Sequence, residues 1–316
     1  MQCLEIRYGG MMTTVQDPGR YGFAHLGVSA AGAADPWSFR IANLLVGNNE
    51  AAAVLEMTLT GAEIGFEDAA LIALTGADMR PLLDGLRIPM WTAVEVRAGQ
   101  TLAVGAAESG ARTYLAVSGG IDVPRVFGSS STHVRTGVGG FCGRALRQGD
   151  RVGVAAGSAS SMRAGLALKA GYRDYFLPPK ALRVTAGLQA RLFGREGADL
   201  FYSSRFEVKN ESDRMGLRLA GAAPIAARNR SEILTEGVSL GAVQITHDGN
   251  PIILFIDHQT TGGYPKIANV IAADFHGLGQ LRPGDAVAFV EVSLEAAHEL
   301  LMEQESLFRQ ELFERQ

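Results

Sequence analysis

Residues His247–Lys266, HDGNPIILFIDHQTTGGYPK, carry the clearest fold signal in the chain. The apolar run within them, Pro251–Ile256, is short, rich in β-branched residues and bounded by turn residues, which predicts a buried strand. Asp257 stands at the exit of that strand, where a side chain is presented to a ligand. A polar loop follows and supplies His258, Gln259, Thr260 and Thr261.

The same stretch ends in a glycine turn. Gly262 and Gly263 carry no Cβ, so backbone can approach a ligand closely there, and at least one of them is expected to adopt a positive φ. Tyr264-Pro265 is expected to begin a helix through Ile267–Ala273, since proline suits the first helical position. Tyr264 and Lys266 complete the candidate binding residues. The alternative interpretation is an ordinary strand–turn–helix connection.

The rest of the chain repeats this strand pattern, because many short apolar runs are separated by turn signals. Such spacing predicts a mainly β (α+β) protein of barrels or sandwiches rather than alternating βαβ units. One turn formula precedes a strand three times, at Arg97–Leu102, Arg147–Val152 and Arg282–Val287. The expected strands are Cys3–Tyr8, Val54–Leu59, Ala70–Thr75, Thr92–Val96, Thr101–Val104, Thr113–Ser118, Arg151–Ala155, Ala181–Thr185, Ile252–Ile256 and Ala286–Val292.

The strands fall into two halves of similar length. We therefore expect two β-rich lobes at 1–155 and 172–292, joined by an Ala-, Gly- and Ser-rich connector at 156–171. The tail, 293–316, is expected to be an amphipathic helix that docks on the protein or binds a partner. A further helix is predicted after Asp35, because Asp35 suits the N-cap and Pro36 the first helical position. The apolar stripe of the tail is Leu294, Ala297, Leu301, Phe308 and Leu312.

Composition excludes several classes of function. The chain has 316 residues, of which 47% are hydrophobic, and a net charge of −4 without a basic run. It can bury a full core and is not expected to bind nucleic acid. No apolar segment reaches about 18 residues, and no secretory leader pattern is present. A cytoplasmic protein without a membrane partner is therefore expected.

Familiar nucleotide, metal and disulfide motifs are missing from the sequence. There is no phosphate-binding loop of the G-x-x-x-x-G-K-[ST] type, and Gly137–Gly143 lacks the spacing of a dinucleotide-binding turn. The six histidines show no H-x-x-x-H or H-E-x-x-H pattern, so no metal site is predicted. Cys3 and Cys142 fall in no disulfide or zinc pattern.

Polar side chains at turns and strand ends are the candidates for a site. Together they are predicted to form a polar cleft between the lobes, a common place for ligands. The guanidinium groups among them suit a substrate carboxylate. Each residue taken alone is equally a cap, a turn residue or part of a solvated loop. The cleft set consists of Arg20, Asp35, Asp78, Arg214, Gln244 and Asp257, and Gln16 and Asp17 are further candidates beside Arg20 at the turn after Gln16.

Several polar stretches occur in one order along nearly the whole chain. They are Thr13–Gly22, Leu45–Asn48, Leu55-Glu56, Thr58–Gly61, Leu74–Asp78, Tyr114–Ile121, Gly128-Ser129, Ser131-Thr132, Ser212–Gly216 and Asp257–Pro265. In this order they resemble the family of the C subunit of bacterial 5-oxoprolinase. That family is also described as the biotin-dependent carboxyltransferase or allophanate hydrolase subunit 2 family, and it includes the antagonist of a sporulation kinase inhibitor.

The resemblance implies two cyclophilin-like β-barrel lobes with a few short helices and a C-terminal helix. It also implies ATP-dependent opening of 5-oxo-L-proline to L-glutamate together with subunits A and B. ATP would be used by the complex, since this chain has no ATP motif. Arg20 or Arg214 is expected to hold the substrate carboxylate. The expected catalytic residues, which would orient water, are Asp257, Gln259 and Asp78.

Two other functions stay open. The related carboxyltransferase half of urea carboxylase uses carboxybiotin. This chain has no Met-Lys-Met biotin acceptor, so biotin would have to come from elsewhere for carboxylation of urea or a similar amide. The other alternative is a non-catalytic regulator that binds and antagonises a kinase-inhibitor partner.

Overall fold

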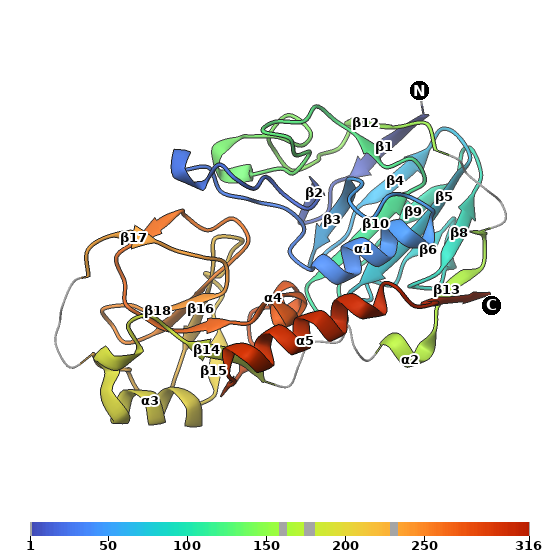
Figure 1. Cartoon of the computed structure of the whole chain (residues 1–316). Helices are drawn as coiled ribbons and strands as arrows, with labels where there is room; N and C mark the ends of the chain where they lie inside the picture. Colours follow the sequence, from blue (N-terminus) through green and yellow to red (C-terminus); the bar gives the residue numbers. More distant parts are fainter. Residues whose placement is uncertain (1, 158–162, 174–180, 228–232, 316) are drawn as a thin grey trace. The chain divides into compact units, whose positions relative to one another are not determined.

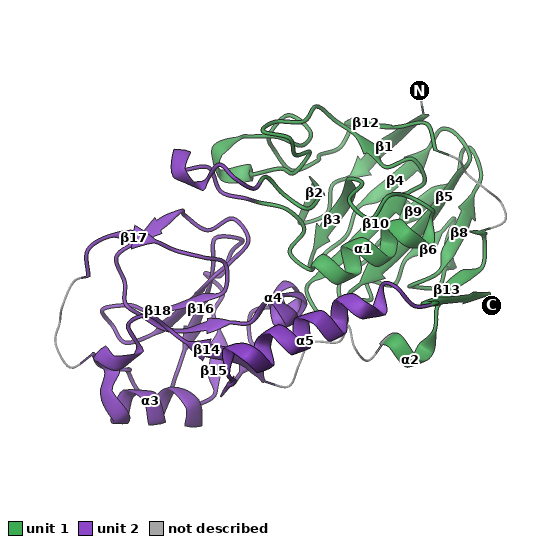
Figure 2. Cartoon of the chain, viewed as in Figure 1, with its two compact units in different colours: residues 1–20, 31–176, 311–316 green, residues 21–30, 177–310 purple. Residues whose placement is uncertain are grey.

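The computed structural model describes residues 2–157, 163–173, 181–227 and 233–315. The chain divides into two compact units, shown in Figure 2: unit 1 comprises residues 1–20, 31–176 and 311–316, and unit 2 comprises residues 21–30 and 177–310. The sequence predicted contiguous lobes, whereas each unit takes in a segment from outside its lobe. Tyr21–Ala30 belongs to unit 2 and Glu311–Gln316 belongs to unit 1. Of the predicted connector, residues 158–162 lie outside the described ranges.

Unit 1 is built mainly from two antiparallel sheets, most of whose strands are labelled in Figure 1. The seven-stranded sheet has the order β11-β12-β1-β4-β9-β6-β7, and the five-stranded sheet has the order β2-β3-β10-β5-β8. A two-stranded sheet pairs β13 with β24. The bounds are β1 Gln2–Tyr8, β2 Met12–Gln16, β3 Val54–Thr58, β4 Glu63–Phe66, β5 Ala70–Gly76, β6 Leu82–Leu83, β7 Leu86–Arg87, β8 Ala93–Val96, β9 Thr101–Ala103, β10 Arg112–Val117, β11 Ile121–Asp122, β12 Arg151–Val154, β13 Leu166–Leu168 and β24 Phe313–Arg315.

The core of unit 1 follows from the side-chain pattern of its strands. In β1, Leu4 and Ile6 are fully buried while Glu5 and Arg7 are exposed, as expected when alternate side chains face a core and solvent. β5 is buried on both faces, since helix α1 (Pro36–Leu45) contacts both β5 and β10. α1 begins as predicted, because the Asp35 carboxylate accepts from the backbone amides of Trp37 and Ser38.

Unit 2 contains an eight-stranded sheet with the order β22-β15-β16-β19-β18-β21-β14-β23, and a two-stranded sheet of β17 and β20. The helices with their bounds are α3 Gly194–Ser203, α4 Phe275–Gln280 and α5 Leu294–Leu307, and α2 is Ala170–Arg173 in unit 1. The strand bounds are β14 Leu182–Ala186, β15 Phe206–Val208, β16 Gly216–Ala220, β17 Glu236-Gly237, β18 Ala242–Ile245, β19 Pro251–Leu254, β20 Thr261-Gly262, β21 Lys266–Val270, β22 Ala286-Val287 and β23 Phe289–Glu291.

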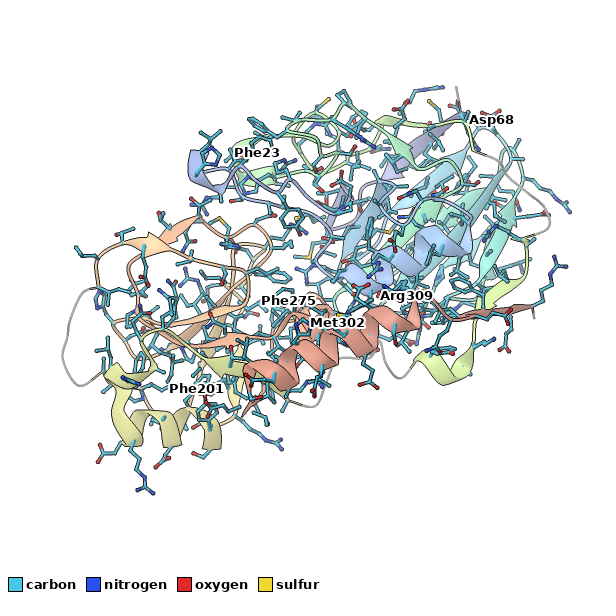
Figure 3. The ribbon with its side chains drawn as sticks, in the orientation of Figure 1. Phe23, Asp68, Phe201, Phe275, Met302 and Arg309 are labelled. Carbon is cyan, nitrogen blue, oxygen red and sulfur yellow. The ribbon has the colours of Figure 1, made fainter. Side chains whose placement is uncertain are left out.

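Aromatic side chains join α3 to the sheet of unit 2. Phe201, labelled on α3 in Figure 3, stacks on Phe289 with ring centroids 4.5 Å apart and also lies 5.9 Å from Phe206. All three side chains are at most 2% exposed. Aromatic pairs at these separations add stability beyond the area that they bury, so this cluster fixes α3 against β15 and β23.

Two predicted helices differ from the structure. Residues 266–270 form the strand β21, which pairs with β18 and β14, rather than a helix after Pro265. Pairing on both edges outweighs the local preference of proline for a helix start. The tail helix is shorter than expected, because α5 ends at Leu307 and Phe313–Arg315 forms β24 against β13. Leu294, expected on the apolar stripe, is 73% exposed.

The recurring turn formula gives three matching turns. The amides of Gln100, Asp150 and Asp285 each donate to the carbonyl three residues earlier, at 3.1–3.2 Å. The side chains of the same three residues accept from the amide at that earlier position, at 2.8–3.0 Å. The intervening glycines have φ between +86° and +88°, a conformation that strongly favours glycine.

Among the described residues, no helix is long and apolar enough to span a bilayer.

Candidate functional site

Asp257 follows β19 and faces Arg214, which precedes β16. The Arg214 Nε donates to Asp257 Oδ2 at 2.9 Å, and its Nη2 donates to Oδ1 at 3.0 Å. The Asp257 amide donates to the Arg214 carbonyl oxygen at 2.8 Å. Both side chains are 5% exposed. Such a two-pronged, buried pair holds each side chain in one orientation. The residues predicted to have separate roles are therefore partners in one ion pair.

The loop after Asp257 is held by hydrogen bonds to its backbone. The His258 amide donates to the Phe255 carbonyl oxygen at 2.9 Å, and the Ser29 hydroxyl donates to the His258 carbonyl oxygen at 2.7 Å. The His258 Nδ1 lies 2.7 Å from the carbonyl oxygen of Gln259. Burial lowers the pKa of His258, against the opposing effects of that carbonyl and of Asp257. Gln259 is exposed beside His258.

The glycine turn requires glycine because of close contacts with neighbouring atoms rather than because of a positive φ. Thr261 and Gly262 form β20, which pairs with Glu236-Gly237 of β17, and the Val238 amide donates to Thr260 O at 3.1 Å. Neither glycine has a positive φ, so that expectation is wrong. A Cβ on Gly262 would lie 2.7 Å from Gln244 Nε2, whereas a Cβ on Gly263 would have no atom nearer than 3.6 Å. Gly262 is therefore the glycine on which the turn depends.

Gln244 connects this turn to the centre of the sheet. It lies on β18 opposite Ile252 of β19 and Lys266 of β21, and it is 2% exposed. Its Nε2 is 3.4 Å from the Tyr264 carbonyl oxygen. The side-chain amide thus lies between the glycine turn and the start of β21.

Lys266 is a further buried cation of this region. The residue is 3% exposed, and its Nζ forms an ion pair with Glu236 Oε1. The Gln189 Nε2 donates to the same oxygen at 2.8 Å, while the Lys266 amide donates to Gln189 Oε1 at 3.1 Å. The hydrogen bond from Lys266, followed by that from Gln189, lowers the pKa of Glu236. Lys266, Glu236, Gln189 and Gln244 form what we call the Lys266 cluster.

Sequence reasoning missed Glu236 and Gln189 as partners of Lys266. Glu236 is 30 residues from Lys266 and Gln189 is 77 residues away. No spacing or periodicity of the sequence relates residues that far apart. The one available signal is Lys266 itself, which stands directly before a largely apolar run. A lysine is almost never buried without a partner, so its position indicates that a partner exists but not which residue it is.

In unit 1, Asp17 organises a turn rather than standing open to a ligand. Its Oδ1 accepts from the hydroxyls of Ser129 at 2.6 Å and Ser131 at 2.5 Å, and from the Gly19 amide at 2.8 Å. Its Oδ2 accepts from the Ser130 amide at 2.6 Å. With these four donors the Asp17 carboxylate joins the turn after β2 to the segment 129–131.

Gln16 and Arg20 hold the same segment. The Gln16 Nε2 donates to the Thr132 carbonyl oxygen at 3.1 Å, and the Arg20 Nη2 donates to the Ser131 carbonyl oxygen. The Arg20 Nε donates to Val126 O at 3.4 Å. Both residues are at most 2% exposed. These contacts indicate that Gln16, Asp17 and Arg20 have a structural role, which is to hold the turn after β2 against this segment.

Asp35 and Asp78 occupy two further places in unit 1. Asp35 is fully buried as the N-cap of α1, and its amide donates to the Tyr114 hydroxyl at 2.7 Å. Asp78 accepts from Arg87 Nη2 with both oxygens, at 2.8 and 2.7 Å, and its side chain is 39% exposed. Hydrogen bonding thus gives both carboxylates local roles. A polar cleft that joins them to Asp257 stays a prediction.

The residues brought together in unit 2 are the ones suited to binding. Lys266 and Gln244 supply an ammonium and an amide close to the backbone of the glycine turn, and Gln259 and Thr261 are exposed on the adjoining loop. Ammonium and amide groups bind carboxylates and oxyanions.

Among the described residues, no group of three or more histidine, cysteine or acidic side chains is placed to hold a metal ion.

The sequence of the chain is similar to known proteins along most of its length. Residues 26–291 match the model of the family described as carboxyltransferase domain, subdomain A and B. The chain is 42% identical to the C subunit of 5-oxoprolinase from Escherichia coli over 97% of both chains. It is 36% identical to urea amidolyase of Saccharomyces cerevisiae over 94% of this chain, which spans 17% of that enzyme.

Solved structures agree with the sequence comparisons. The urea amidolyase of K. lactis superposes with a TM-score of 0.88 at 32% identity, covering 96% of this chain and 19% of that one. The mainly β fold predicted from the sequence is therefore confirmed, as is the family resemblance. The chain belongs to the carboxyltransferase domain family with subdomains A and B.

Proposed function

We propose that the chain is the C subunit of an ATP-dependent 5-oxoprolinase, which hydrolyses 5-oxo-L-proline to L-glutamate together with subunits A and B. The observation that carries the proposal is the 42% identity with a relative named as the C subunit of 5-oxoprolinase, over 97% of both lengths. The urea amidolyases are several times longer than this chain. A complex that consumes ATP would act in the cytoplasm.

The Lys266 cluster supports the substrate class. 5-Oxo-L-proline carries a carboxylate and a lactam carbonyl, and both are bound by cationic or amide donors. We assign these donors to Lys266 and Gln244, with the exposed Gln259 and Thr261 completing the contact. Asp257 then positions the loop through its pair with Arg214.

The proposed reaction is a ring opening. The lactam C–N bond breaks, a C–O bond to water forms, the ring nitrogen takes a proton, and ATP is hydrolysed to ADP and phosphate. A lactam is a poor electrophile, so ATP supplies the activation when it is bound to the complex. The groups of this chain bind the substrate carboxylate and orient the ring, which lowers the entropy cost of the reaction.

ATP itself does not fit the glycine-rich stretch Gly137–Gly143. A Cβ on Gly139 would lie 2.6 Å from Arg20 Nη2, and one on Gly140 would lie 2.8 Å from the Cβ of Thr132. A Cβ on Gly143 would lie 2.8 Å from the Cα of Gly137. These glycines let the chain pack closely on itself rather than expose amides to phosphates. We therefore assign the ATP site to the companion subunits.

The second candidate is biotin-dependent carboxyl transfer to urea or a similar amide. It is supported by the likeness to urea amidolyase, 36% identical in sequence to the S. cerevisiae enzyme and at a TM-score of 0.88 to the K. lactis structure. The Lys266 ammonium and Gln244 amide also fit a carboxylate of this origin. Carboxybiotin, supplied from another protein, would provide the carboxyl group.

Reconstitution with one component omitted at a time separates the candidates. The purified chain and subunits A and B from the same source are incubated with 5-oxo-L-proline and ATP, and glutamate and ADP are measured. The proposal predicts coupled formation of both products only when all three components are present. Robust glutamate formation by this chain alone would contradict it, and labelled carboxyl transfer from carboxybiotin to urea would favour the second candidate.

A further inference from the structure

A cleft of about 440 Å³ opens on unit 2 beside the hairpin of β18 and β19. Its volume lies within the range of small-molecule sites. The rings of His247 and Tyr264 pack in an edge-to-face arrangement, with centroids 5.2 Å apart, and form part of the wall. Charged side chains and an apolar surface share the rest of the lining, which includes Lys209, Glu211, Arg218, Leu219, Pro251 and Ile252.

Two cations stand opposite each other in this cleft. Val208 of β15 pairs with Leu219 of β16, and the next residue, Lys209, donates its amide to the Arg218 carbonyl oxygen at 2.8 Å. Lys209 and Arg218 are therefore neighbours across the hairpin, where like charges are destabilising. Within the described part of the chain, neither side chain forms a hydrogen bond or an ion pair. An anion bound between them would offset that repulsion.

The two acidic residues of the cleft, Asp248 and Glu211, differ in their hydrogen bonds. Asp248 is used by its own turn, since it accepts from the Thr246 hydroxyl and from Asn250 Nδ2, and these bonds lower its pKa. Glu211 is exposed, and its carboxylate forms no hydrogen bond or ion pair with the residues that the structure describes. The charged groups of the cleft are thus two cations and two carboxylates, and of the two carboxylates only Glu211 has no hydrogen-bond donor in the described part of the chain.

We propose that this cleft binds a dicarboxylic α-amino acid. Two carboxylates of the ligand face Lys209 and Arg218, its ammonium faces Glu211, and its methylene groups cover the partly buried side chain of Ile252. The match of charges is the observation that carries the inference. It goes beyond the proposed function, because it concerns binding to this chain alone. L-Glutamate, the product in the proposed reaction, belongs to the same class.

Calorimetry on the full chain without companion subunits tests this inference. We expect saturable binding of L-glutamate with a Kd of about 1 mM or tighter at low salt. Glutarate lacks the ammonium and L-glutamine lacks the second carboxylate, so each is expected to bind about tenfold more weakly or worse. No saturable binding of L-glutamate, or equal binding of glutarate and L-glutamate, would overturn the proposal.

Substitutions of cleft residues test whether L-glutamate binds in this cleft. Arg218→Ala should weaken L-glutamate binding by about tenfold or more, since it removes a charge-assisted partner. Glu211→Gln should bring the affinities for L-glutamate and glutarate together. The matched control is Arg195→Ala, because Arg195 is 91% exposed on α3 and lies outside the cleft. Binding that survives Arg218→Ala unchanged would overturn the site. None of these results depends on turnover, so they are independent of the proposed reaction.

Discussion

Arg214 and Asp257 are joined three times: by two hydrogen bonds between their side chains, at 2.9 and 3.0 Å, and by the bond from the Asp257 amide to the Arg214 carbonyl oxygen at 2.8 Å. The pair fixes the exit of β19 to the segment before β16. The loop that carries Gln259 starts from this point. The orientation of the candidate site thus depends on an ion pair that is itself shielded from solvent.

Asp257→Asn is expected to lower the free energy of unfolding by about 3 kcal/mol, because it removes the carboxylate charge to which the buried guanidinium of Arg214 donates two hydrogen bonds. Urea denaturation of the purified chain measures this change. The matched control is Asp78→Asn, which alters an ion pair with Arg87 that is partly exposed. Its cost should be about 1 kcal/mol or less. Equal stability of wild type and Asp257→Asn would show that the pair contributes little.

The two glycines of the turn should respond differently to a side chain. Gly262→Val places its Cβ 2.7 Å from Gln244 Nε2, whereas the Cβ of Gly263→Val meets no atom nearer than 3.6 Å. We expect Gly262→Val to displace Gln244 and to weaken substrate binding in the assembled complex by about tenfold. Gly263→Val should bind normally. Affinity and Tm of both variants are compared, and a reversed order of the two affinities would be incompatible with the geometry of the turn.

The Glu236–Lys266 pair predicts a pH dependence of stability. The hydrogen bonds to Glu236 lower its pKa in the folded chain below its ordinary value of 4.5. The contribution of this pair is therefore fully present above pH 4.5 and is lost as the pH falls through the folded-state pKa. Glu236→Gln should have a lower Tm than wild type at pH 7, and the difference should shrink below pH 4.5. A difference that grows on acidification would refute the assignment.

Local chemistry explains what the sequence could predict. Asp35-Pro36 predicted the start of α1, and the apolar runs predicted most strands, because capping and alternation act within a few residues. The strand at 266–270 was mistaken for a helix, since its partners, β18 and β14, are distant in sequence.

In the candidate site, too, contacts between residues distant in sequence could not be predicted. The loop at 257–266 could be singled out from its own residues. That Asp257 pairs with Arg214, 43 residues away, and that Lys266 pairs with Glu236 could not, because such partners are chosen by the tertiary fold. Asp17, Gln16 and Arg20 have the composition of a substrate contact, although three of the four donors to Asp17 come from a segment more than 110 residues away.

The Lys266 cluster is proposed to act on the substrate in 5-oxoproline hydrolysis, and a single variant tests this role. The measurement is kcat and KM for glutamate formation by the reconstituted complex that contains Lys266→Met, with complex assembly checked by gel filtration. The matched control is Lys169→Met, since Lys169 lies in unit 1 and its side chain is 33% exposed. We expect a loss in kcat/KM on the order of a hundredfold for Lys266→Met, with normal assembly. Unchanged kinetics of an assembled Lys266→Met complex would show that the cluster has no part in the reaction.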